Sequence, residues 1–247
     1  MKEMKKVLLA AVLFFAAVNV QASLITLGSG DISMISNVFF DTDVPAVTID
    51  GPVNIQQGVG SVQQIIDSSG TVWDAGSAGS ELNFFFTGLI LDNFQSTPIV
   101  NVFANVLGSV SFWENDLGTF QATGNFGQDA VNIGSGTNLL NATGHPVDPN
   151  GWTVTGSSNT TGIGGNGNLD LINGPLIDNF VQDTISLSDA SLADMSFNFS
   201  GDKLNTNGYN WSGSADFATV STVPLPGAIW LFGIGLVSLV GFKRAGA

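Results

Sequence analysis

Short segments in which apolar and polar residues alternate are the feature that most constrains the fold of this chain. The clearest is residues 211–217, where apolar or small side chains take the odd positions and polar side chains the even ones. Residues 184–188 and 196–200 repeat the pattern. Because successive side chains of a β-strand point to opposite faces of a sheet, this alternation predicts strands that are buried on one face.

Further strand candidates follow one another along the chain, separated by clusters of turn-forming residues such as residues 67–70. Residues 81–91 are almost continuously apolar, which favours a central strand. The other candidates are residues 32–40, 46–49, 62–66, 99–106, 109–113, 120–123 and 152–155. A turn at intervals of roughly 8 to 15 residues is typical of antiparallel sheets. We therefore expect an all-β domain, built as an antiparallel β-sandwich of the jelly-roll type.

One long segment lacks any strand pattern. Residues 156–168 are rich in glycine, asparagine, serine and threonine, and Ile163 is their only large apolar residue. Low complexity of this kind predicts a long, mobile surface loop.

Charge and cysteine content narrow the range of functions. The chain has no cysteine, which excludes disulfides, thiolate catalysis and zinc-thiolate sites. Of its 20 acidic residues, all except Glu3 lie between the two terminal segments, where Lys203 is the only basic residue. Such an acidic surface repels phosphate backbones and argues against a nucleic-acid partner. It is compatible with divalent cations or basic partners, and the aspartates also suit solvated turns.

Residues 1–22 have the three parts of a Sec signal peptide. Three lysines form a basic start, residues 7–18 are apolar, and small residues at Val20 and Ala22 predict cleavage between Ala22 and Ser23. About 12 apolar residues are too few to cross a bilayer core of about 30 Å. We therefore expect an N-terminal signal helix that directs export.

Residues 223–247 predict a membrane-spanning tail. Two prolines begin the segment in an extended conformation, and residues 228–242 contain no charged side chain. At a rise of about 1.5 Å per residue, residues 225–242 cover about 27 Å, which is just enough to cross a bilayer. A basic pair follows the apolar stretch at once and places that end in the cytoplasm. The tail therefore predicts a transmembrane helix with the β-rich domain outside.

The tail resembles the PEP-CTERM sorting signal in its proline motif, its short glycine-containing span and its basic pair. The motif residues are Val223, Pro224, Leu225 and Pro226, and the membrane-stop residues are Lys243 and Arg244. Leu225 occupies the position of the glutamate after which the family is named. The resemblance implies cleavage near the prolines by an exosortase-like membrane protease, in a bacterium that makes extracellular polysaccharide. A sortase substrate is disfavoured, since residues 225–229 do not continue as Leu-Pro-x-Thr-Gly.

Two kinds of catalytic site can be tested against the sequence. Glycoside hydrolysis needs two facing carboxylates, and Glu81 and Glu114 are the only glutamates of the central domain. No local motif supports that activity. His145 is the only histidine, so any Ser-His-Asp site must use it as the base, but no Gly-x-Ser-x-Gly motif accompanies it. We interpret His145, beside a proline, as an exposed turn residue and predict no catalytic residues.

Calcium is the cofactor that this composition suits best, although we expect no cofactor to be required. Asp41 and Asp43 place two carboxylates two positions apart, and Asp170 ends a glycine- and asparagine-rich segment similar to a calcium-binding turn. A structural calcium ion at any of these residues is one alternative, and a solvated turn is the other. Tryptophans such as Trp152 could stack on sugars if exposed.

These observations predict a signal peptide at residues 1–22, a β-rich extracellular domain at 23–222 and a sorting tail at 223–247. We expect a non-catalytic structural protein, surface-anchored or secreted, in the envelope or in a polysaccharide and biofilm matrix. Its expected partners are the membrane, an exosortase-like protease and extracellular polysaccharide. A calcium-assisted glycan-binding module is the alternative, and a glycoside hydrolase is the third.

Overall fold

A computed structural model describes the central part of the chain. Its described residues are 25, 27–43, 53–76, 79–91, 100–103, 108–145, 153–156, 162–187, 190–203 and 208–222. The predicted signal peptide, the predicted tail and the strand candidate at 46–49 lie outside these residues. Within the described ranges, no helix is long and apolar enough to cross a membrane.

The described residues are mostly β-strands. The strands are β1 (Gly30–Asp43), β2 (Val53–Asp67), β3 (Gly70–Asp74), β4 (Ser80–Leu91), β5 (Val100–Phe103), β6 (Ser109–Asp116), β7 (Thr137–Gly144), β8 (Thr153–Gly156), β9 (Gly162–Asn173), β10 (Ile185–Ser186), β11 (Leu192–Ala193), β12 (Met195–Lys203) and β13 (Trp211–Ser221). The helical elements are α2 (Phe126–Ile133) and the single 3-10 turn η1 (Ile177–Asn179). The strand candidate at 120–123 is wrong, because these residues form the irregular approach to α2.

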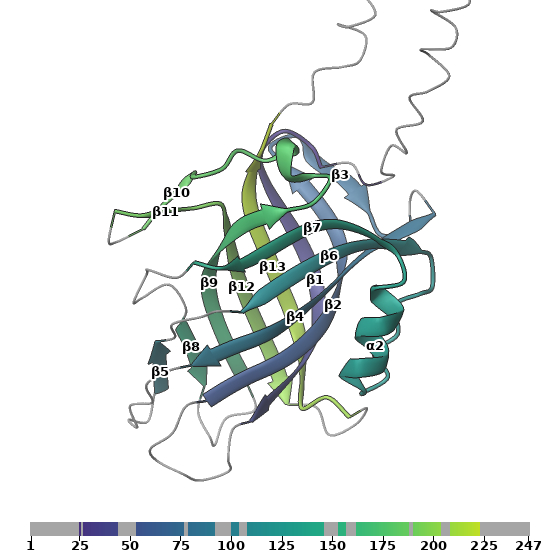
Figure 1. Ribbon diagram of the computed structural model, residues 1–247, viewed down its shortest axis with the longest axis vertical. Coiled ribbons are helices and arrows are strands. Elements are labelled where there is room, and N and C mark those ends of the chain that lie inside the picture. The colour runs from purple at the N-terminus through teal and green to yellow at the C-terminus, as the bar shows by residue number, and fades with distance from the viewer. Residues whose placement is uncertain are drawn as a thin grey trace, which may run out of the picture.

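Eight strands form one closed, barrel-like sheet (Figure 1). Their order is β12-β13-β1-β2-β4-β6-β7-β9, and β9 pairs again with β12 to close the ring. All of these pairings are antiparallel, which confirms the all-β antiparallel prediction. These eight strands are arranged as a single closed sheet instead of the two facing sheets of a sandwich, and β10 and β11 form a separate two-stranded sheet. Alternation predicts a buried face equally well for both, so it could not decide between them.

The ring closes through a segment whose composition predicts a loop. Residues 162–168 are the first part of β9 and pair with β12, while residues 163–166 pair with β8 on their other side. The later part of β9, from residue 169 to 173, pairs with β7. Gly167 stands opposite Phe197, and Gly165 stands opposite Phe199. A glycine leaves room beside a large aromatic neighbour, so a run that looks unstructured by composition is suited to this place in the sheet. The loop prediction is therefore wrong for this part of the segment.

The interior of the closed sheet is filled by phenylalanines. The ring of Phe217 lies 5.0 Å from Phe84, 5.0 Å from Phe112 and 4.7 Å from Phe197, measured between ring centroids. These four side chains come from four different strands and are almost completely buried. The aromatic cluster therefore binds opposite walls of the ring together.

Glycines of β2 make room for two of the interior rings. Gly60 pairs with Phe84 and Gly58 with Phe86 in the adjacent strand β4. A Cβ atom at Gly60 would overlap the Phe84 ring and lie 2.6 Å from the carbonyl oxygen of Asn37. These positions therefore require glycine because of close packing.

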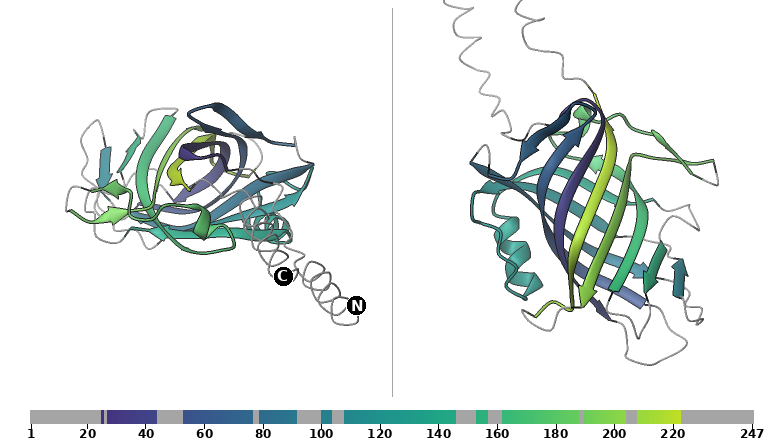
Figure 2. Two further views of the ribbon diagram at one scale, coloured as in Figure 1. Left: turned by 90° about the horizontal axis from the view of Figure 1, so that it is seen from above. Right: turned by 180° about the vertical axis from the view of Figure 1, so that it is seen from behind.

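A second, smaller cluster lies outside the ring, where α2 covers the outer face of the sheet (Figure 2). Asn125 caps the helix by accepting a hydrogen bond from the N–H of Gln128 at 3.1 Å. Asp129 in the first turn is buried and accepts hydrogen bonds from the Thr123 N–H at 3.0 Å, the Thr123 hydroxyl at 2.6 Å and the Tyr209 hydroxyl at 2.8 Å. This carboxylate joins the helix, its preceding loop and the segment before β13.

The environment of Tyr209 predicts a loss of stability in alkali. Burial raises the pKa of Tyr209, and its hydrogen bond to Asp129 raises that pKa further. Tyrosine in the unfolded chain ionises near pH 10, so above about pH 10 the unfolded state releases a proton that the folded state retains. Below that pH the contribution of Tyr209 to stability is fully present, and above it the free energy of unfolding falls as pH rises.

The chain has a single tyrosine, so its ultraviolet absorbance tests this directly. We expect tyrosinate absorbance to appear together with loss of folded circular dichroism. In urea titrations, Tyr209→Phe should remove the part of the fall in unfolding free energy above about pH 10 that comes from Tyr209. Tyrosinate absorbance near pH 10 in the folded protein would contradict the prediction.

Candidate functional site

His145 directly follows β7 and is held against β9. Its backbone N–H donates to the carbonyl oxygen of Asn168 at 3.0 Å. On the other side of β7, the carbonyl oxygen of Gly108 accepts hydrogen bonds from the Thr143 hydroxyl at 3.0 Å and the Gly144 N–H at 2.9 Å. His145 is only 9% exposed. The interpretation of this residue as an exposed turn histidine is therefore wrong.

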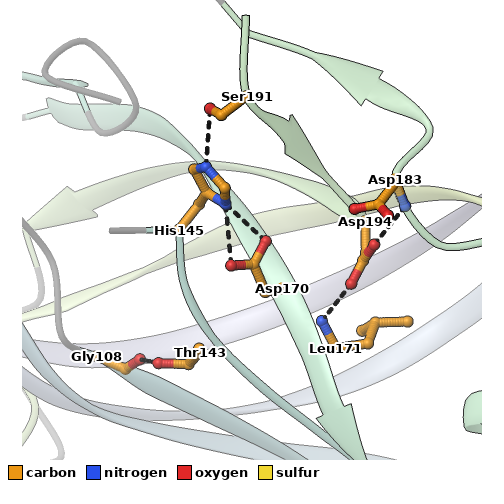
Figure 3. Close-up of polar contacts among 8 residues, drawn as sticks. All are labelled: Gly108, Thr143, His145, Asp170, Leu171, Asp183, Ser191 and Asp194. Atoms are coloured by element: carbon orange, nitrogen blue, oxygen red, sulfur yellow. Dashed lines mark hydrogen bonds and ion pairs between the residues drawn. The ribbon is translucent and has the colours of Figure 1, made fainter. Parts of the chain in front are cut away.

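Asp170 of β9 orients the imidazole ring of His145 (Figure 3). Its two carboxylate oxygens lie 2.7 and 2.9 Å from Nδ1. In the backbone register Asp170 pairs with Thr143, which makes it a diagonal neighbour of His145 across the two strands. A carboxylate at this distance favours a proton on Nδ1, and the other ring nitrogen, Nε2, then accepts.

Ser191 approaches that second nitrogen. Its Oγ lies 2.9 Å from Nε2 of His145, so the hydroxyl donates to the imidazole when Nδ1 carries the proton. Ser191 is half-buried and lies in the turn between β10 and β11, where its carbonyl accepts from the Leu187 N–H at 3.0 Å. Ala190, directly before it, has a left-handed backbone with φ of 68°.

Asp194 ties the base of this hairpin to β9. It is buried, and its carboxylate accepts from the Leu171 N–H at 2.7 Å and from the Asp183 N–H at 2.6 Å (Figure 3). Its own N–H donates to the carbonyl oxygen of Leu169 at 3.0 Å. The residues before and after Asp170 are thus both bonded to Asp194, so the hairpin that carries Ser191 is fixed relative to Asp170.

Three segments far apart in sequence therefore bring together a hydroxyl, an imidazole and a carboxylate in a continuous line of hydrogen bonds. No protein-family model, curated protein or solved structure matches this chain. The site is accordingly interpreted from its own geometry. In that geometry the imidazole can take the hydroxyl proton while the carboxylate holds the ring in place.

The residues proposed for calcium are not gathered in the described part of the chain. Asp41 accepts a hydrogen bond from the Asn210 N–H at 2.9 Å, and Asp170 is paired with His145. The backbone of Asp43 belongs to β1, and its side chain lies outside the described part. Among the residues that the structure describes, no group of three or more acidic, histidine or cysteine side chains is placed to hold a metal ion.

The two glutamates considered for glycoside hydrolysis lie on opposite faces of the sheet. Glu114 pairs with Leu82, whose side chain is in the core, and so belongs to the inner face. Glu81 is adjacent to Leu82 and belongs to the outer face, where it accepts from the backbone N–H groups of Gly118 and Phe120 at 2.6 and 2.9 Å. They cannot act across one sugar ring, and Glu81 instead anchors the loop before α2.

The remaining predicted functional residues lie outside the described ranges. They are Ala22, Ser23, Val223, Pro224, Leu225, Pro226, Lys243, Arg244 and the candidate stacking residue Trp152. Their assignments remain predictions from sequence.

No sequence pattern marks Ser191 as a functional residue. The single histidine pointed to the only possible base, and Asp170 was noted for a different role, but Ser191 is one of many serines and has no motif around it. Only the pairing of β7 with β9 and the turn between β10 and β11 bring these three side chains together.

Proposed function

We propose that this chain is an exported bacterial structural protein of the envelope or of a polysaccharide matrix, attached by its tail before processing. The proposal rests on one observation, which is that two terminal segments with export and membrane-sorting features flank the β-rich domain. The Sec signal would bring the domain across the membrane. The PEP-CTERM-like tail would hold it at the outer surface until an exosortase-like protease cuts near Pro224 and Pro226.

The strand topology supports attachment of the domain to a membrane through one end of the ring. Its first and last long strands, β1 and β13, are antiparallel neighbours, and Gly30 pairs with Ser221. Both connections to the terminal segments therefore leave from the same end of the ring. A domain attached in this way can stand on a membrane with its opposite end directed outward.

Mass spectrometry of the mature termini tests this proposal. The full chain would be expressed in an exosortase-containing bacterium, and the envelope and medium would be separated. We expect a mature N-terminus at Ser23 and a C-terminus close to Pro226. Pro224→Ala combined with Pro226→Ala should retain the uncut chain in the membrane fraction, because the recognition motif is lost.

Ser238→Ala is the matched control, since it alters the same tail outside the proline motif and should leave processing unchanged. A wild-type product that begins at Met1 would contradict export by a cleaved signal. A mature product that still ends at Ala247 would contradict removal of the tail.

A further inference from the structure

The line of hydrogen bonds through Ser191, His145 and Asp170 has the distances of a nucleophile, its base and the group that orients the base. The nucleophile to base distance is 2.9 Å and the base to carboxylate distances are 2.7 and 2.9 Å. Both fall within the hydrogen-bond reach of about 2.6–3.2 Å that proton transfer requires. We propose that this site is a serine nucleophile site that hydrolyses neutral carboxylic esters, an activity additional to the proposed structural role.

The base and its orienting group are held by the closed sheet itself. His145 is bonded through its backbone to β9, and Asp170 lies within β9 between two residues that bond to Asp194. Sites on paired strands are positioned more rigidly than sites on loops. The imidazole therefore needs no rearrangement before it accepts a proton.

The imidazole is the most buried member of the three. His145 is 9% exposed, so the proton-accepting ring is largely removed from water, whereas the Asp170 carboxylate is 32% exposed. Ser191 is half-buried at the outer end of the line, on a hairpin that projects from the side of the ring (Figure 1). The hydroxyl is thus more accessible to a substrate than the imidazole to which it is bonded.

The backbone directly before Ser191 is strained. Ala190 adopts a left-handed conformation with φ of 68°, which is unfavourable for a residue with a Cβ atom. Strain of this kind persists where surrounding contacts impose it, and it occurs often beside reacting groups. Here the Leu187 N–H to Ser191 carbonyl bond and the Ala190 N–H to Leu187 carbonyl bond close the turn at 3.0 and 3.1 Å.

The reaction would proceed in two balanced steps. Ser191 Oγ attacks the ester carbonyl carbon while its proton moves to Nε2 of His145, and that proton then leaves with the alcohol as the carbon–oxygen bond breaks. Water next attacks the acyl group on Ser191, giving its proton to Nε2. The carboxylic acid leaves, and the proton returns to Ser191 Oγ.

The charge of the chain restricts the substrate. Asp170, Asp183 and Asp194 all lie around the site, and the whole chain has a formal net charge of −14. An ester that carries its own negative charge would be repelled on approach. Anionic esters are therefore disfavoured, and an uncharged ester is the simplest substrate class that remains.

Covalent labelling tests the nucleophile without knowledge of the natural substrate. The full chain would be treated with a fluorophosphonate, and the labelled peptide would be identified by mass spectrometry. Release of p-nitrophenol from p-nitrophenyl acetate would be followed in parallel. We expect an adduct on Ser191 and hydrolysis above the uncatalysed rate.

Three variants and one control test the roles of Ser191, His145 and Asp170. Ser191→Ala should abolish both labelling and hydrolysis, and His145→Asn or Asp170→Asn should lower the rate about 10²–10⁴-fold. Ser186→Ala, an exposed serine on the same hairpin, should leave both unchanged. Circular dichroism and thermal melting would show that each variant is folded.

Absence of a Ser191 adduct in the folded wild-type chain would overturn the proposal. So would labelling and hydrolysis that Ser191→Ala leaves intact. If the protein is exported and processed but shows neither a Ser191 adduct nor ester hydrolysis, the proposed structural function stands. Only the proposed esterase activity is then contradicted.

Discussion

Replacement of Phe217 with alanine is expected to lower the free energy of unfolding by about 3–5 kcal/mol. Phe217 is fully buried and contacts Phe84, Phe112 and Phe197 from three other strands. Its removal would leave a cavity at the centre of the ring, where the paired strands restrict the movement of surrounding groups. Urea denaturation followed by circular dichroism measures the change as a lower midpoint with an unchanged slope.

Leu117→Ala is the control for loss of a large apolar side chain. Leu117 is 61% exposed, so its removal should change the free energy of unfolding by less than about 0.5 kcal/mol. A Phe217→Ala variant as stable as Leu117→Ala would show that the aromatic cluster does not hold the walls of the ring together.

Asp129→Ala is expected to cost about 3 kcal/mol. The variant leaves the buried hydroxyl of Tyr209 without its acceptor and removes two hydrogen bonds from Thr123. It also removes a negative charge from the first turn of α2, where the helix dipole favours one. Chemical denaturation gives the magnitude, and faster hydrogen exchange of the α2 amides would locate the effect.

Tyr209→Phe separates the parts of this network. It removes only the hydroxyl and leaves the ring in its cluster, so we expect a loss near 1 kcal/mol. If Asp129→Ala costs no more than Tyr209→Phe, the Thr123 contacts contribute nothing measurable and the carboxylate does not anchor the loop.

The strands were more predictable from sequence than their closure into a ring. Alternation at residues 196–200 and 211–217 identified parts of β12 and β13, because burial on one face imposes a period of two. The identity of the closing strand was hidden, since Gly165 and Gly167 have a composition typical of loops. Their role becomes clear only beside Phe197 and Phe199 of β12.

The helix and the candidate site were hidden for related reasons. Residues 126–133 are stabilised in part by the buried bond between Asp129 and Tyr209, which are 80 positions apart. Ser191 is 46 positions from His145. A local motif cannot indicate such contacts, whereas the presence of one histidine leaves His145 as the only imidazole that a proposed site could use.

The pairing of β1 with β13 determines how the domain would respond to mechanical load. Force that pulls the N-terminal and C-terminal ends of the domain apart would act first on the pair Gly30 and Ser221. It would then separate the β1–β13 ladder one hydrogen-bonded pair after another. If the domain is anchored through its C-terminus as proposed, force between that anchor and a partner at the opposite end would instead run along the strands. It would load the whole ladder in shear, because the hydrogen bonds lie across the strands. A tethered copy pulled outward by a surrounding matrix would thus resist in its stronger direction.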